Sequence, residues 1–277
     1  MKLALHSTTL LGGLALGCQS APSAPPPAPP PASAHDADAE LAKQLSNPIA
    51  ALISVPIQVN VDTGIGADDA ERTTINFQPV VPFALDEEWN LITRTIVPLI
   101  DAEAPTSTDS DESGLGDILA SQWLSPRKPT ESGWIWGVGG AFLLPTASSE
   151  ALGSEKWALG PTLIALRQEH GWTYGMLANH LWSVAGDDAR AEVNSTFVQP
   201  FLTFTTHSKT TLALNTESTY DWTASQWSVP VNLQLSQLVR VGKLPLSLGV
   251  GYREYVDGPP GGPDWGLRFI VTFLFPK

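Results

Sequence analysis

The sequence is poor in charge, in cysteine and in long apolar runs, and each shortage excludes a class of protein. Only 16% of its 277 residues are charged, against roughly 25% in an average globular protein. The single cysteine, Cys18, excludes an intrachain disulfide. After the first 18 residues, no apolar run reaches the length of a membrane-spanning helix. A membrane protein with this sequence must therefore be a closed β-barrel, because only helices and closed barrels satisfy every backbone group in hydrocarbon.

Basic residues are also scarce. The chain has 15 Lys and Arg against 28 Asp and Glu, a net charge of −13. Without a basic stripe to neutralise phosphates, nucleic acid is excluded as a partner, and so is a basic membrane-surface helix. A phosphate loop, a dinucleotide fingerprint and a cluster of metal ligands are likewise missing. We therefore expect no cofactor and no metal.

The first 18 residues, MKLALHSTTLLGGLALGC, are typical of an export signal. Lys2 provides a positive start, and mostly apolar or small residues follow it. The end of this stretch, Ala15-Leu16-Gly17-Cys18, resembles a lipoprotein signal, in which Cys18 would be lipidated. Ordinary cleavage before residue 35 is the alternative, and the sequence leaves both interpretations open.

Residues 19–45 are rich in Ala and Pro and include PSAPPPAPPPASA. Such a stretch is extended and does not pack, so we predict a disordered linker between the signal and a barrel over residues 46–277.

Short segments of alternating polarity recur from residue 53 onward. In the last of them, Trp265, Leu267 and Phe269 alternate with Gly266, Arg268 and Ile270. A period of two residues predicts a strand with one apolar face. Twelve such segments lie at 53–64, 73–84, 89–100, 116–125, 133–145, 156–168, 171–184, 194–206, 209–219, 227–240, 243–255 and 265–275.

The connections between these segments separate a membrane barrel from a soluble β-sandwich. Long links follow the odd-numbered segments, and mostly short links follow the even-numbered ones, as in outer-membrane barrels. The ten tryptophans also fall near predicted strand ends, as two interfacial girdles would require. Trp89, Trp123, Trp134, Trp136 and Trp172 are assigned to the short-turn side, and Trp157, Trp182, Trp222, Trp227 and Trp265 to the long-loop side. We predict an all-β fold, a transmembrane antiparallel up-and-down β-barrel of about twelve strands.

Prolines fall inside the predicted strands, among them those at positions 56, 79, 98, 161, 200, 230 and 245. Proline cannot donate to a strand ladder, and a closed barrel has no edge strand to hold it. Bulges or strand starts are the expected places for these residues.

Several stretches resemble a family of outer-membrane transporters related to the meta-pathway phenol-degradation protein, whose bacterial members are sometimes named neuromedin U. They include INFQPVVPFAL, WIWGVGGAFLLPTA, LGSEKWALGPT, WTYGMLANHLWS, VPVNLQLSQLV and WGLRFIVTFLFPK, and together they cover most of residues 41–277. The resemblance implies an outer-membrane barrel that passes small, often hydrophobic or aromatic, organic solutes. It also implies contact with outer-membrane lipids and lipopolysaccharide, and with the barrel-assembly machinery, for which Phe275 is the candidate aromatic signal.

Function in such a barrel would lie in the lumen. Inward-facing positions follow from the alternation, since an Arg turned toward lipid costs about 2–4 kcal/mol at mid-depth. The predicted lumen-lining residues are Asn76, Gln78, Arg94, Gln199, Asn215, Glu217, Asn232, Gln234, Arg253 and Arg268. They would either line a selective pore or fill the lumen through pairs such as Glu217 with Arg253 or Arg268.

Two other features have alternative interpretations. The small residues Gly137, Gly139 and Ala141 would either leave lumen space or allow a kink in the strand. Six acids between Asp101 and Asp117 suggest a divalent-cation site, but TSTDSDES lacks the spacing of a calcium loop, which favours a solvated acidic loop.

Passive or facilitated passage of small organic solutes is the predicted function. A non-conducting structural or sensing barrel is one alternative, and a barrel lipid hydrolase is another. We expect no enzyme, because His180 falls at the rim opposite the predicted turn that holds His207 and Ser208.

Overall fold

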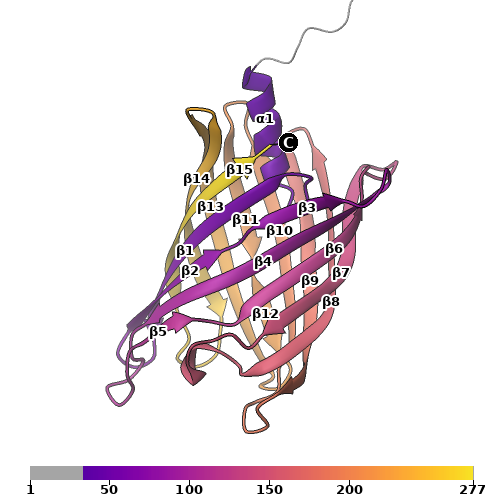
Figure 1. Ribbon diagram of the computed structural model, residues 1–277. Helices are drawn as coiled ribbons and strands as arrows, with labels where there is room; N and C mark the ends of the chain where they lie inside the picture. Colours follow the sequence, from indigo (N-terminus) through magenta and orange to yellow (C-terminus); the bar gives the residue numbers. More distant parts are fainter. Residues whose placement is uncertain (1–33, 277) are drawn as a thin grey trace, which may run out of the picture. The chain divides into compact units, whose positions relative to one another are not determined.

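The computed structural model describes residues 34–276, which form one helix followed by an antiparallel β-barrel (Figure 1). Every strand pairing between residues 53 and 275 is antiparallel, and β1 pairs with β15 from Ile53↔Phe275 to Thr63↔Trp265, which closes the sheet on itself. The elements are α1 (Ala34–Leu45), β1 (Ile53–Ile65), β2 (Ala70–Phe77), β3 (Val80–Ala84), β4 (Trp89–Ala102), β5 (Glu112–Leu115), β6 (Ile118–Pro126), β7 (Trp134–Leu144), η1 (Glu150–Leu152), β8 (Lys156–Glu169), β9 (Trp172–Gly186), β10 (Asn194–Thr205), β11 (Thr210–Thr216), β12 (Ser218–Asp221), β13 (Gln226–Val241), β14 (Leu244–Asp257) and β15 (Trp265–Phe275).

Fifteen β-segments of the described chain make twelve strands, because three strands are interrupted. β2 and β3 follow one another along β4, and so do β5 and β6, while β11 and β12 share both neighbours, β10 and β13. The predicted fold class is confirmed: a closed twelve-stranded antiparallel barrel. The structure divides the predicted segments 73–84 and 209–219, and it adds β5 ahead of the predicted segment 116–125.

Proline explains the interruptions. Pro79 lies in the break between β2 and β3. Pro98 on β4 accepts a hydrogen bond from Gly116 in the β5–β6 break, at 2.9 Å, and Pro230 on β13 accepts one from Glu217 in the β11–β12 break, at 3.2 Å. Each of these prolines lacks the N–H that a continuous ladder would need, so the ladder breaks beside it.

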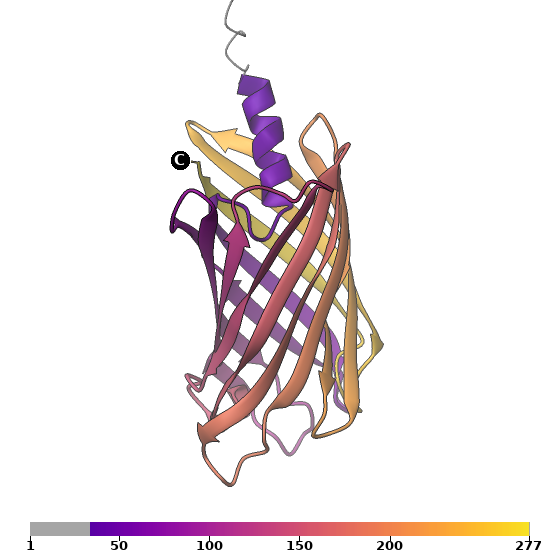
Figure 2. The same ribbon diagram turned by 90° about the vertical axis from the view of Figure 1, so that its right-hand side faces the viewer.

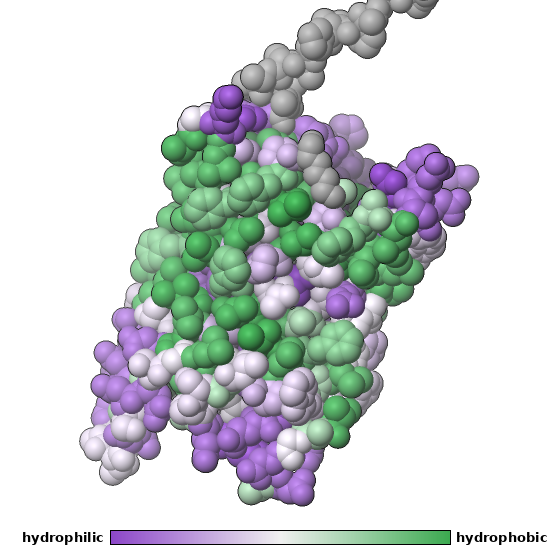
Figure 3. Space-filling model, viewed as in Figure 1, coloured by the Kyte–Doolittle hydropathy of each residue, from purple (hydrophilic) through white to green (hydrophobic). Residues whose placement is uncertain are grey.

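The exterior of the barrel is apolar between two polar ends. Large hydrophobic side chains on alternate positions of the strands point outward, among them Leu163 (46% exposed), Leu233 (50%) and Phe269 (48%). Figure 3 shows this apolar surface between the hydrophilic turns at one end and the hydrophilic loops at the other. So much apolar surface would be costly in water, and it fits a bilayer. No helix among residues 34–276 is long and apolar enough to span a membrane.

Most of the tryptophans at the strand ends lie on the outer face of the barrel, and Trp123 is an exception. Trp157, Trp172 and Trp222 are 44–55% exposed on the outer face. Trp123, assigned to the short-turn girdle, is only 1% exposed and donates its Nε1–H to Thr162 Oγ1 at 3.2 Å. It shares the inward face of β6 with Ser121 and Ser125, so its position in the alternation places it inside the barrel.

The disordered linker predicted over residues 19–45 is wrong for its last part, because residues 34–45 form α1. The last proline of the stretch is Pro31, and the following AHDADAELAKQL is rich in Ala, Leu, Glu and Lys, which favour helix. The export signal, Cys18 and the Pro-rich part of the linker lie outside the described residues.

Helix α1 reaches the end of the barrel that carries the short turns and the C-terminus, and the chain after it enters the lumen (Figure 2). Leu41 and Ala42 pack with Ala50, Leu52, Leu238 and Leu274. Ile49 packs deeper, in a cluster that includes Trp123 and Ile164. We call α1 together with residues 46–52 the plug segment.

Candidate functional site: the barrel lumen

Glu217 is the centre of an ionic network inside the barrel. It lies in the break between β11 and β12. Its Oε1 and Oε2 accept hydrogen bonds from Nη1 and Nη2 of Arg268, both at 2.8 Å, and Oε2 also accepts one from Arg253 Nη2 at 2.5 Å. Arg268 is 2% exposed and Arg253 is 7% exposed. The two guanidinium groups therefore occupy the whole carboxylate of Glu217.

Neighbouring strands supply the remaining partners of the two arginines. Arg253 Nη1 donates to Asp62 Oδ1 at 3.2 Å, and Arg253 Nε donates to Asn232 Oδ1 at 3.0 Å. Arg268 Nε donates to Asn60 Oδ1 at 2.7 Å. Asn232 in turn donates to Asn215 at 3.1 Å, and Arg72 lies 3.7 Å from Asp62. A network in which each buried charge is paired and hydrogen-bonded fills this sector of the lumen and holds it rigid.

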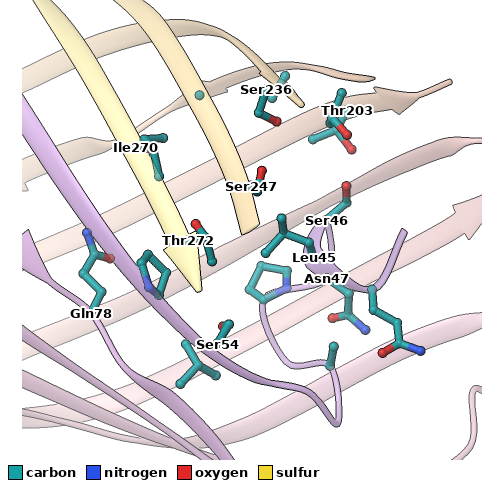
Figure 4. A pocket seen from close by; sticks show the side chains of 18 of the residues that line it. Leu45, Ser46, Asn47, Ser54, Gln78, Thr203, Ser236, Ser247, Ile270 and Thr272 are labelled. Atoms are coloured by element: carbon teal, nitrogen blue, oxygen red, sulfur yellow. The ribbon is translucent and has the colours of Figure 1, made fainter. Parts of the chain in front are cut away.

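Two cavities lie beside the network. The plug-side cavity, of about 270 Å³, lies between the plug segment and the polar inner face of β1, β13, β14 and β15. Figure 4 shows Leu45, Ser46 and Asn47 of the plug segment and Ser54, Ser247 and Thr272 of the barrel around this space. The central cavity, of about 280 Å³, lies next to Glu217. Gln58, Gln78 and Arg94 line both cavities, so the two meet at these three side chains.

Arg94 differs from the other two arginines. Its Nη2 donates to Gln78 Oε1 at 2.6 Å. No carboxylate of residues 34–276 lies within the 4.0 Å that would make an ion pair with it. A guanidinium has five N–H groups, so Arg94 keeps donors available to whatever occupies the cavities.

The wall of the central cavity is divided by polarity. Amide and charged side chains, among them Asn76, Gln199 and Glu217, form one part. Apolar side chains form the other: Ile96, Leu119, Trp123, Leu177, Leu181 and Phe197. They come from β4, β6, β9 and β10. The cavity is therefore amphipathic.

The structure brings the ten predicted lumen residues to one region. Asn76, Gln78, Arg94, Gln199 and Glu217 line the central cavity, and Gln234 lines the plug-side cavity. Asn215, Asn232, Arg253 and Arg268 belong to the network around Glu217. The predicted alternative pairs, Glu217 with Arg253 and Glu217 with Arg268, are both formed. One sector of the lumen is thus filled and another is hollow.

Sequence reasoning missed part of this site. Gln58, Asn60 and Asp62 of β1 face inward, and their alternation with Val59 and Val61 would have identified them. The plug segment carries no such signal, because nothing in its composition shows where it docks.

The small residues of β7 face inward and accommodate their neighbours. A Cβ on Gly137 would lie 3.1 Å from the Cβ of Trp123 and 3.4 Å from Ile49 Cδ1. A Cβ on Gly139 would lie 1.8 Å from the carbonyl oxygen of Gln122. Close approach of a neighbouring strand and of the plug segment therefore explains these glycines.

The remaining candidate residues form hydrogen bonds and packing contacts with their neighbours. His180 Nδ1 lies 2.7 Å from Thr196 Oγ1 and its ring packs on Trp182, whereas Ser208 lies in the β10–β11 turn and bonds Thr206. Asp117 accepts hydrogen bonds from Thr146, Ala147 and Ser154, which fasten the loop before β8. Among residues 34–276 no group of three or more His, Cys, Asp or Glu is arranged to hold a metal ion.

An apolar exterior around a polar, partly hollow interior defines a porin-like membrane β-barrel. Neither a protein-family model nor a curated protein matches the sequence. The family expected from the sequence therefore stays a prediction.

Solved structures provide the comparison. An outer membrane channel from Pseudomonas putida F1 is 16% identical, with a TM-score of 0.63 over 81% of this chain and 94% of that one. The NanC porin is 11% identical, with a TM-score of 0.51 over 80% of this chain and 100% of that one. Outer membrane phospholipase A from Escherichia coli is 10% identical, with a TM-score of 0.49 over 80% and 90%. At these identities the first two similarities show the fold alone, and the third carries no argument.

Proposed function

We propose that this protein is a bacterial outer-membrane channel through which small organic solutes diffuse. The observation that carries the proposal is the pair of cavities that meet at Gln58, Gln78 and Arg94 inside a closed barrel. Diffusion down a gradient needs no energy-coupling group. The similarity to a structure described as an outer membrane channel and to one described as a porin supports the same function.

The proposed location in the outer membrane implies the other partners. The apolar outer face would contact outer-membrane lipids and lipopolysaccharide, and assembly would require the barrel-assembly machinery. A lipid on Cys18 would add a second attachment through the N-terminus. Small, compact organic molecules with apolar parts are the proposed solutes, because the central cavity offers the apolar side chains of Leu177 and Phe197 beside polar ones.

A non-conducting structural barrel is the alternative that the filled sector around Glu217 would favour. A lipid hydrolase has less support, since His180 bonds Thr196 on the outer face and no serine among residues 34–276 hydrogen-bonds to its ring. We therefore propose passage without catalysis.

Planar-bilayer conductance of the full chain, beside a variant lacking residues 34–52, tests the proposal. We expect discrete conductance steps from the full chain and larger steps from the variant, because the plug segment bounds one end of the plug-side cavity. Both proteins must first migrate as folded barrels on unboiled SDS gels. Folded protein that conducts in neither form would contradict passage and support the non-conducting alternative.

A further inference from the structure

We propose that the central cavity is a binding site for a small organic anion, with the anion's carboxylate on Arg94 and its compact apolar body against the wall that contains Leu177, Leu181 and Phe197. The inference deepens the proposed function by naming a solute class. The inference rests on the proposed function only for the route by which the ligand reaches the cavity.

The arginine side of the site has an unused binding capacity. Arg253 and Arg268 are committed to Glu217, and Arg253 also to Asp62. Among residues 34–276, the side chain of Arg94 hydrogen-bonds the neutral amide of Gln78, at 2.6 Å, and forms no ion pair. A planar guanidinium binds a carboxylate through two parallel N–H···O bonds. The free donors of Arg94 are suited to bind a carboxylate in this way.

The charge balance of the interior favours an anion. The network and Arg94 together hold four guanidinium groups, on Arg72, Arg94, Arg253 and Arg268, against the two carboxylates of Asp62 and Glu217. This local excess of positive charge stands in a chain whose net charge is −13. An anionic ligand would restore the balance where Arg94 lies.

The apolar side of the site is preformed. Leu177 is 3% exposed, and Trp123 is 1% exposed and anchored by its hydrogen bond to Thr162. Phe197 packs against the same cluster. An apolar body that entered this space would displace water from a rigid surface, which favours binding in proportion to the area covered.

The size of the cavity restricts the body of the ligand. At about 280 Å³ it falls at the lower limit of pockets that hold drug-sized molecules. A single ring with a carboxylate fits that limit, whereas an oligosaccharide or an extended acyl chain does not. Acetate would fit but would leave the apolar wall uncovered.

Calorimetric titration of the full chain, refolded in detergent, tests the site without requiring transport. The ligands are benzoate, cyclohexanecarboxylate, benzyl alcohol and acetate. We expect the two ring carboxylates to bind, and benzyl alcohol and acetate to bind at least about tenfold more weakly. Benzyl alcohol lacks the carboxylate that would bind Arg94, and acetate lacks the ring that would cover the apolar wall. Equal binding of benzyl alcohol and benzoate would overturn the assignment of a carboxylate.

Two variants locate the binding. Arg94→Gln should weaken benzoate binding by about tenfold or more, since it removes a charge-assisted pair. Arg167→Gln removes the same charge outside both cavities, where Arg167 pairs with Glu169, and should leave the affinity unchanged. Equal losses in the two variants would overturn the site, because they would show a general effect of charge. Unboiled SDS gels confirm that each variant is folded.

A third variant tests the apolar wall. Phe197→Ser should reduce the preference for benzoate over acetate while both anions still bind through Arg94. An unchanged preference would contradict the role of the wall. Binding of benzoate by a protein that does not conduct would support the site and contradict passage, whereas conductance without any benzoate binding would support passage and overturn the site.

Discussion

Glu217 shows how one residue determines the stability of the barrel interior. Its carboxylate is the shared partner of two buried arginines, and its position in a strand break leaves the side chain turned toward both. Removing one member of a buried ion pair leaves the other charge without compensation, which is more costly than never having formed the pair.

We expect Glu217→Gln to lower the free energy of unfolding by about 3 kcal/mol, the size seen when a buried pair is broken. An amide can still accept one hydrogen bond from Arg268 or Arg253, but it carries no charge. Urea denaturation in detergent, followed by tryptophan fluorescence, measures the change. Glu87→Gln, in the exposed β3–β4 turn, is the matched control and should have little effect. A loss no larger than the control's would mean that water, and not Glu217, compensates the two arginines.

Residue by residue, alternation was enough to find most of the lumen. A polar side chain between two apolar ones on a strand faces away from lipid, which is why Asn232 and Gln234 were predictable between Val231, Leu233 and Leu235. The partners of those residues were not predictable, because Asp62 and Arg253 are 191 positions apart and meet only when the barrel closes.

At the scale of elements, helix α1 is held to the barrel by charge and by apolar contact. Asp38 Oδ1 accepts a hydrogen bond from Arg240 Nε at 2.6 Å, and its Oδ2 lies 3.2 Å from Lys209 Nζ. Leu41, one turn along the helix, is buried with Leu238 and Leu274. The hydrogen bond from Arg240 is the main cause that lowers the pKa of Asp38 below its ordinary value of 3.8.

This shift determines the direction of a pH dependence. A carboxyl group with a lowered pKa in the folded state stabilises that state above its unfolded pKa, and the stabilisation is lost as the pH falls through the lower, folded value. We expect residues 46–52 to be protected from hydrogen exchange at pH 5 and above, and to lose part of that protection below about pH 4. Exchange rates corrected for their intrinsic pH dependence provide the measurement.

Substitution of the acid separates this effect from general acid unfolding. Asp38→Asn should show reduced protection of residues 46–52 already at neutral pH and little further change on acidification. Glu40→Gln, on the same helix, is the control, since the Glu40 side chain is exposed and, within the described part of the chain, accepts only from Gln44, at 3.3 Å. If Asp38→Asn retained the pH dependence of the original protein, another group would have to hold the helix.

For the molecule as a whole, the division between a lipid-facing and a lumen-facing surface is the feature that the fold imposes. Leu233 is 50% exposed on the outer face of β13, and its neighbour Gln234 lines the plug-side cavity. The two positions are adjacent in sequence, but one side chain lies on the apolar outer face and the other lies in the polar lumen.

An arginine placed at each of these positions tests that division. We expect Leu233→Arg to destabilise the folded barrel by about 2–4 kcal/mol, the cost of Arg near the middle of a bilayer. Gln234→Arg should cost far less, because the side chain enters the polar lumen. Folding into lipid vesicles, followed by the shift in mobility between boiled and unboiled samples, compares them. Equal destabilisation by the two variants would contradict the assignment of the two faces.

The local pattern of the sequence by itself determined the class of fold, the approximate position of each strand and the face of most lumen residues. These depend on period-two alternation and on turn residues, which are local properties. Only the tertiary structure decided where prolines break the ladder, how Glu217 is shared between two arginines, and where the plug segment docks. It also decided that Arg94 keeps free donors beside an apolar wall. These features depend on contacts between distant segments, which arise only when β1 pairs with β15 and the chain before β1 enters the closed barrel.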